Sequence, residues 1–178
     1  MYLSRFTSSF NRGAGYVYEL DEIEPKLYLS GADEASSVET LKKYKITHIL
    51  TINDYPLTPS VKEELGYINK KFICLPDMVT SDLLSYFDEC YEFIREGVSR
   101  GAVLVHCQMG VSRSATIVIA YLMKKYRIKY REALDKVRAR RCVYPNPGFV
   151  SQLEKYNEMG YNTMNRFAPR SRSSSYYR

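Results

Sequence analysis

The sequence has no tryptophan, only two histidines and no long apolar run. A membrane helix needs about 18 consecutive apolar residues and a secretory signal needs a shorter apolar core, so neither is expected. The cysteines lie at irregular spacing without a C-x-x-C pair, at Cys74, Cys90, Cys107 and Cys142. With so few histidines, a structural zinc site is not expected either. We therefore expect reduced thiols and a cytoplasmic or nuclear protein.

Acidic residues are missing from both ends of the chain. Residues 1–18 hold Arg5 and Arg12, residues 166–178 hold four arginines, and together these account for the whole net charge of +6. We interpret 1–18 as a flexible arm, 19–165 as one folded domain and 166–178 as a disordered basic tail. Mitochondrial transit peptides also lack acids, but this stays a minor alternative because no long amphipathic stripe is present.

The domain itself has an acidic and a basic half. Residues 19–94 contain 15 acidic and 7 basic side chains, whereas residues 95–141 contain 3 acidic and 12 basic ones. A basic half attracts anions, although solvated helical faces carry the same kind of charge. Neither an aromatic-interleaved basic motif nor zinc-finger spacing is present, so a phosphorylated substrate is favoured over nucleic acid.

Hydrophobic periodicity predicts an alternation of strands and helices. Short apolar runs indicate strands over 26–31, 47–53, 67–76 and 102–106. Helical patterns cover 36–46, 81–101, 113–126, 130–140 and 148–158. A capping box from Ser36 to Glu39 predicts the start of the first helix. This order predicts a single α/β domain, with a central and mainly parallel sheet flanked by helices.

The most informative segment is VHCQMGVSRSATIVIAYLMKK, residues 105–125. It runs from a buried strand through a tight loop into a helix, with Cys107 and Arg113 at the two ends of the loop. Such a loop turns successive backbone N–H groups toward an oxyanion, and Gly110 can take the positive φ angle that the curl needs. A thiol at the base of this cradle is favoured as the thiolate, which can attack a bound phosphate.

The side chains around this loop suit phosphoryl transfer. Arg113 offers planar, bidentate donors for two phosphate oxygens. Ser114 carries a hydroxyl that can hydrogen-bond the sulfur and help it leave in a second step. His106 is interpreted as a support for the loop backbone rather than as a base. The residues predicted to bind phosphate are Gln108, Met109, Gly110, Val111, Ser112 and Arg113.

HCQMGVSRS resembles the signature HCxxGxxR[ST] of protein-tyrosine phosphatases, and AYLM at 120–123 resembles their dual-specificity branch. The resemblance covers residues 25–160, with IEPKLYLSG, LPDMVTSDLLSYF and PNPGF in the family's order. It implies a small dual-specificity phosphatase that hydrolyses phosphotyrosine, phosphoserine and phosphothreonine in proteins through a phosphocysteine. Neither a metal nor another cofactor is expected, because the backbone cradle and Arg113 supply the charge stabilisation.

Phosphoryl transfer also needs an acid, because a serine or tyrosine oxygen leaves poorly as an anion. In the family this acid lies on a mobile loop before the cysteine. The family places it six residues before a leucine, and Asp77 stands six residues before Leu83. Asp82 is an alternative, although it is placed to cap the helix that follows. Asp54, after the 47–53 strand, is a more remote alternative and is interpreted as a turn residue.

Three interpretations concern the surroundings of the loop. By resemblance, Arg141 matches a rim position that can hold a second phosphate; alternatively it is a solvated helix end. Asn146 and Asn53 are expected to brace the loop through hydrogen bonds. The other three cysteines, Cys74, Cys90 and Cys142, are interpreted as core packing residues. A protective disulfide between Cys107 and one of them is chemically plausible.

Two other functions use the same motif. The first is hydrolysis of a non-protein phosphate, such as a phosphoinositide, a glucan or an RNA 5′ end. The uncharged loop residues Gln108, Met109 and Val111 argue against a highly charged head group. The second is a binding module that captures phosphorylated partners without catalysis, which the complete set of candidate catalytic residues disfavours.

Overall fold

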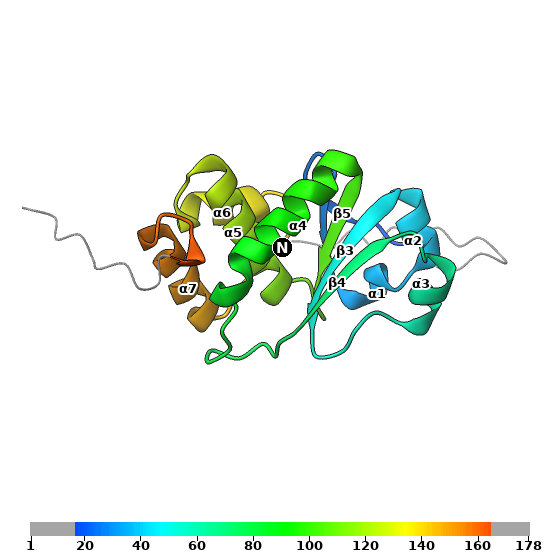
Figure 1. Cartoon of the computed structure of the whole chain (residues 1–178), viewed down its shortest axis with the longest axis horizontal. Helices are drawn as coiled ribbons and strands as arrows, with labels where there is room; N and C mark the ends of the chain where they lie inside the picture. The colour runs from blue at the N-terminus through cyan, green and yellow to red at the C-terminus, as the bar shows by residue number, and fades with distance from the viewer. Residues whose placement is uncertain (1–16, 165–178) are drawn as a thin grey trace, which may run out of the picture.

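The computed structural model describes residues 17–164, apart from the side chain of Lys62. At its centre is a five-stranded sheet with the order β1-β2-β5-β3-β4 (Figure 1). β1 pairs antiparallel with β2, and the other pairs are parallel. The predicted α/β fold with a mainly parallel sheet is confirmed. The strands are β1 (Asp21–Glu24), β2 (Leu27–Ser30), β3 (Ile46–Asn53), β4 (Asn69–Cys74) and β5 (Ala102–His106).

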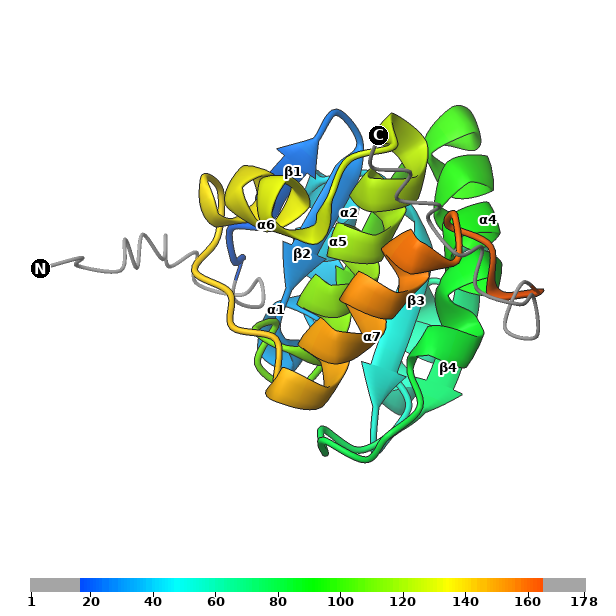
Figure 2. The same cartoon turned by 90° about the vertical axis from the view of Figure 1, so that its left-hand side faces the viewer.

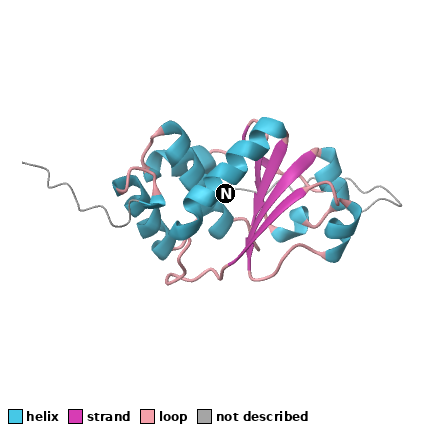
Figure 3. Cartoon of the chain, in the orientation of Figure 1, coloured by secondary structure: helices cyan, strands magenta, loops and turns pink. Residues whose placement is uncertain are grey.

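Helices cover both faces of the sheet (Figure 1, Figure 3). One face carries α1 (Ala32–Ala35), α2 (Val38–Lys43) and α3 (Pro59–Glu64). The other carries α4 (Phe87–Arg100), α5 (Arg113–Tyr126), α6 (Tyr130–Arg138) and α7 (Pro147–Glu158). Strand β5 contributes to both layers, because successive strand side chains point to opposite faces. Val103 and Val105 join the core of the α4–α7 layer, and Leu104 joins that of the α1–α3 layer.

Two predicted helix starts were wrong by a few residues. Helix α2 is capped by Ser37, whose hydroxyl accepts from the Thr40 N–H, because Ser36 instead ends the short helix α1. The helix predicted to begin near 81 begins at Phe87, after a single 3-10 turn. Asp82 caps that turn by accepting from the Ser85 N–H.

The ends of the chain were predicted to be an arm at 1–18 and a basic tail at 166–178. These segments lie outside the described residues, apart from residues 17 and 18. Within 17–164, no helix combines the length and apolar character that crossing a bilayer requires.

Asp88 joins the helices of the α4–α7 layer to one another. Its carboxylate accepts hydrogen bonds from Lys124 of α5, Tyr156 of α7 and the backbone and hydroxyl of Thr163. Burial opposes ionisation of this carboxyl group, but the hydrogen bonds from Lys124, Thr163 and Tyr156 outweigh it and lower its pKa to about 2. The ionised form is therefore the one that the fold stabilises.

We expect Asp88→Ala to lower the free energy of unfolding by about 1 to 2 kcal/mol at neutral pH, because partly buried donors lose a charged acceptor. The folded-state pKa lies below the usual 3.8, so this contribution is present above pH 4 and is lost as the pH falls toward 2. Denaturant unfolding of both proteins at a series of pH values measures the effect. A difference that does not shrink toward acidic pH would contradict the account.

Candidate active site

The loop between β5 and α5 (residues 107–112, the phosphate loop) is held from outside through its carbonyl oxygens. Each of its six carbonyls accepts a hydrogen bond, from partners on several elements. The pairs are Cys107 with His106 Nδ1, Gln108 with the Ala32 N–H, Met109 and Gly110 with the Arg141 guanidinium, Val111 with the Tyr144 N–H, and Ser112 with Thr116.

Outward carbonyls turn the neighbouring N–H groups inward, because the two point in opposite directions across a trans peptide. The N–H groups of residues 108–113 therefore line the inside of the loop, where the Gly110 N–H lies 3.2 Å from the Cys107 sulfur. Gly110 has a φ of +68°, and a Cβ atom there would lie 2.4 Å from the Ser30 carbonyl oxygen. Only glycine fits this turn, and the result is a ring of donors around the thiol.

Cys107 lies at the floor of this ring and is 2% exposed. Burial alone would raise the pKa of its thiol. Hydrogen bonds from the Ser114 hydroxyl (3.1 Å), the Ser114 N–H and the Gly110 N–H, together with the charge of Arg113, outweigh burial and lower that pKa below its ordinary value. The site therefore favours the nucleophilic thiolate.

His106 supports the loop from behind. Its Nε2 lies 2.8 Å from the Thr51 hydroxyl and its Nδ1 lies 3.4 Å from the Cys107 carbonyl oxygen. Burial lowers the pKa of the imidazole to about 4, so the ring is neutral at pH 7. A neutral ring that is hydrogen-bonded on both sides positions the backbone and is unsuited to act as a base.

Arg113 begins α5, and its guanidinium is held by Asp54, which we interpreted as a turn residue. Its Nη1 donates to Asp54 Oδ2 at 2.8 Å and to the Leu75 carbonyl at 3.0 Å. Its Nε is buried without a hydrogen-bond partner. A buried N–H that lacks an acceptor is costly, and a phosphate oxygen above Cys107 would satisfy it. Asp54 thus orients the guanidinium for phosphate.

Asp77 lies over the mouth of the same loop. Its Oδ1 accepts from the Ser112 hydroxyl at 2.9 Å and from Asn146 Nδ2 at 2.7 Å. Its Oδ2 lies 3.7 Å from Arg113 Nε. Both donors bind Oδ1 and fix the plane of the carboxyl group, and the role of Asp77 as the acid stays a prediction. Asp82 serves the 3-10 turn instead.

Helix α7, which packs beside α5 (Figure 2), anchors the loop that carries Asp77. Gln152 accepts from the N–H groups of Leu83 and Leu84 and donates to the Ser81 carbonyl. A Cβ atom on Gly148 would lie 2.1 Å from the Val79 carbonyl oxygen, so only glycine permits this close approach. Sequence reasoning missed Gln152, because nothing in the sequence near it indicates a contact with a loop 70 residues upstream.

The remaining loop supports are an amide and a guanidinium. Asn53 Nδ2 donates to the Gln108 side chain at 3.2 Å. Arg141 donates through Nε to the Gly110 carbonyl, through Nη2 to the Met109 carbonyl and through Nη1 to Asp21. These bonds use three of the five guanidinium N–H groups, and binding of a second phosphate by Arg141 stays a prediction. Arg141 braces the phosphate loop from outside.

We expect Arg141→Met to lower kcat/KM for a small aryl phosphate by about tenfold, because two loop carbonyls lose their donors and the N–H ring loosens. Steady-state kinetics and inhibition by orthovanadate measure the change. Arg140→Met is the matched control, since Arg140 is an exposed neighbour of equal charge. A variant that loses activity only on doubly phosphorylated peptides would support the second-phosphate interpretation and contradict this one.

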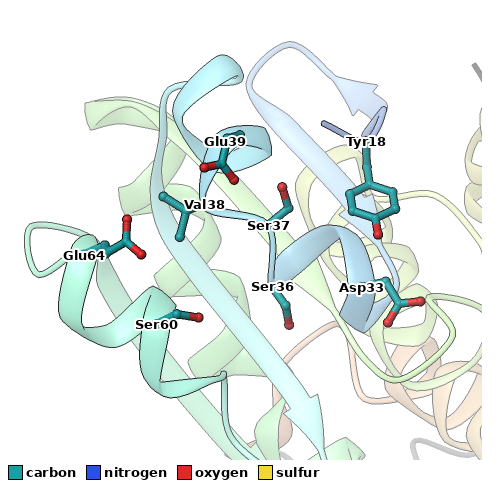
Figure 4. A pocket seen from close by; sticks show the side chains of 8 residues that line it. All are labelled: Tyr18, Asp33, Ser36, Ser37, Val38, Glu39, Ser60 and Glu64. Carbon is teal, nitrogen blue, oxygen red and sulfur yellow. The ribbon is translucent and has the colours of Figure 1, made fainter. Parts of the chain in front are cut away.

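One other hollow of the described structure is unsuited to binding phosphate. A hollow of about 450 Å³ lies beside α1, α2 and α3 (Figure 4). Its lining includes the carboxylates of Asp33, Glu39 and Glu64, which repel a phosphate. Within residues 17–164, no three His, Cys, Asp or Glu side chains come together as metal ligands would.

The four cysteines are free thiols. Burial raises the pKa of Cys90, which makes it a packing residue of low reactivity. Cys74 and Cys142 are exposed, so they are not the core residues that we expected. A redox pair with Cys107 stays a prediction.

Comparisons with known proteins agree with this geometry. The family model described as dual specificity phosphatase, catalytic domain, matches residues 27–159. Dual specificity protein phosphatase 1B of Arabidopsis thaliana is 45% identical over 142 residues, 79% of this chain and 83% of the relative. Dual specificity protein phosphatase 19 of Mus musculus is 41% identical over 152 residues, 81% of this chain and 67% of the relative. The crystal structure of the Yvh1 phosphatase domain from Chaetomium thermophilum is 33% identical and matches with a TM-score of 0.75, over 82% of this chain and 99% of that one. The chain therefore belongs to the dual specificity phosphatase family.

Proposed function

We propose that this chain removes phosphate from phosphotyrosine, phosphoserine and phosphothreonine side chains of proteins, with Cys107 as the nucleophile. The observation that carries the proposal is the ring of inward N–H groups around a thiol of lowered pKa. The ring binds the three non-bridging oxygens and leaves the phosphorus facing the sulfur. Arg113 Nε adds a charged donor to the same oxygens.

In the first step, the Cys107 thiolate attacks phosphorus, so a P–S bond forms and the P–O bond to the substrate breaks. Asp77 gives its proton to the departing oxygen, which leaves as a neutral hydroxyl. The negative charge on the phosphoryl oxygens is stabilised by the backbone N–H groups and by Arg113.

In the second step, water attacks the phosphorus of the phosphocysteine. Asp77, now ionised, takes a proton from the water, and the P–S bond breaks to release inorganic phosphate. The Ser114 hydroxyl, 3.1 Å from the sulfur, donates to the thiolate as it leaves. The enzyme returns to its starting state with the Cys107 thiolate and protonated Asp77.

A substrate panel tests the proposal. In EDTA, we expect kcat/KM for phosphotyrosine and phosphoserine peptides to exceed that for a phosphoinositide or an RNA 5′ phosphate by at least about tenfold. The reason is that the loop side chains Gln108 and Met109 add no cation for a second phosphate group. Preference for the lipid or the RNA would contradict the proposed substrate class. Binding of phosphopeptides without turnover would favour a binding module.

A further inference from the structure

Five exposed apolar side chains belong to the chain segments that build the phosphate loop and its surroundings. Nine large hydrophobic side chains are exposed among the described residues. Four of them lie elsewhere: Tyr67, Phe72, Tyr126 and Met164. The other five, here the apolar rim, are Tyr55 (75% exposed), Met78 (55%), Val79 (59%), Met109 (69%) and Tyr144 (63%). Solvent-exposed apolar groups that cluster at one place are a mark of a binding surface.

The five residues of the apolar rim lie in, or directly next to, the chain segments that build the site. Tyr55 comes directly after Asp54, which binds Arg113. Met78 and Val79 come directly after Asp77 in the acid-carrying loop. Met109 belongs to the phosphate loop itself. The N–H of Tyr144 donates to the Val111 carbonyl at 2.9 Å.

The charged groups around the phosphate loop do not favour a substrate with acidic residues next to its phosphorylated residue. The side chains of Asp54 and Asp77 are 48% and 33% exposed, whereas that of Arg113 is only 6% exposed. Arg141 is occupied by two loop carbonyls and Asp21. The guanidinium of Arg138 lies 5.0 Å from the centre of the Tyr144 ring. That cation–π contact holds the ring in place.

We propose that the apolar rim selects phosphorylated segments whose neighbouring residues are large and apolar. The inference rests on the proposed function. In an extended segment, the residues within two positions of the phosphorylated residue lie about 3 to 7 Å from it along the chain, a reach that would bring them against the rim. Apolar flanks are stabilised by burial against these five side chains. Acidic flanks meet the exposed carboxylate of Asp54 instead.

The test compares two phosphotyrosine peptides that differ only at two positions on each side of the phosphotyrosine, Leu and Phe in one and Glu in the other. We expect kcat/KM to be about tenfold higher for the apolar peptide. The double variant Tyr55→Ser, Tyr144→Ser is expected to bring this ratio close to one. Tyr67→Ser is the matched control and keeps the ratio, because Tyr67 is an equally exposed tyrosine just before β4, whereas the rim lies at the opposite ends of the strands. The ratio is measured within each protein, so partial misfolding does not affect it.

Each other outcome overturns the inference in a distinct way. Wild-type protein that hydrolyses a small aryl phosphate but shows no peptide preference, or prefers Glu flanks, contradicts the inference and leaves the proposed function standing. Specific activity that falls as enzyme concentration rises means that the rim binds a second copy of the chain instead. Wild-type protein that hydrolyses neither the aryl phosphate nor the peptides contradicts the proposed function itself.

Discussion

Cys107→Ser is expected to lower kcat for a small aryl phosphate by about 10⁴-fold or more. The contacts from Ser114, Gly110 and Arg113 lower the pKa of the Cys107 thiol below its ordinary value, which favours the thiolate. A serine hydroxyl in the same place starts from a far higher pKa, so the same contacts leave it protonated. Steady-state turnover in EDTA measures the loss.

Binding should survive this substitution. The ring of N–H groups belongs to the backbone, and its carbonyl partners are untouched by the change at position 107. We therefore expect Cys107→Ser to keep binding a phosphotyrosine peptide, and to lose that binding when free phosphate competes. Residual turnover within tenfold of wild type would show that another group is the nucleophile.

Asp77→Asn is expected to lower kcat by about 10²- to 10⁴-fold for phosphoserine peptides, whose leaving oxygen needs a proton. A nitrophenyl phosphate, whose oxygen leaves well as an anion, should be affected much less in the first step. The alkaline limb of the pH–rate profile should also disappear, because the variant has no acid to lose. The acid limb, which reports the Cys107 thiolate, should remain below the pH of an ordinary thiol.

Asp82→Asn and Asp54→Asn separate this role from that of other carboxylates near the site. Asp82 caps a turn, so its loss should affect stability more than the pH profile. Asp54 orients Arg113, so its loss should raise KM for every phosphate substrate while the alkaline limb stays. If the alkaline limb of the pH–rate profile disappeared in either of these variants and remained in Asp77→Asn, the role of the acid would pass to the residue changed in that variant.

The sequence was sufficient for the parts of the site that lie close together along the chain. The strand, the loop with Gly110 and the helix that begins at Arg113 are consecutive, so local spacing predicts both the nucleophile and the phosphate cradle. The alternation of strands and helices likewise predicts the parallel sheet. Asp77 was distinguished from Asp82 by resemblance, because both residues precede the same helix.

The parts that sequence reasoning missed depend on contacts between distant segments. Asp54 and Arg113 are 59 residues apart, and Arg141 reaches the Gly110 carbonyl over 31 residues. No local pattern predicts such pairs, since they follow from how the ends of β3, β4 and β5 meet. Strand β1 and helix α1 are four residues each, too short for a periodic signal.

The central claim is that phosphate passes through a covalent bond to Cys107, and trapping that bond tests it most directly. Ser114→Ala removes the donor that helps the sulfur leave, so the second step slows and the intermediate accumulates. The variant would be mixed with an aryl phosphate, quenched in acid within milliseconds and digested for mass spectrometry. We predict that the peptide containing Cys107 gains the mass of one phosphoryl group, and that Cys107→Ser in the same background gains none. Phosphate found on a different residue, or a full burst of product without any phosphorylated peptide, would contradict the account.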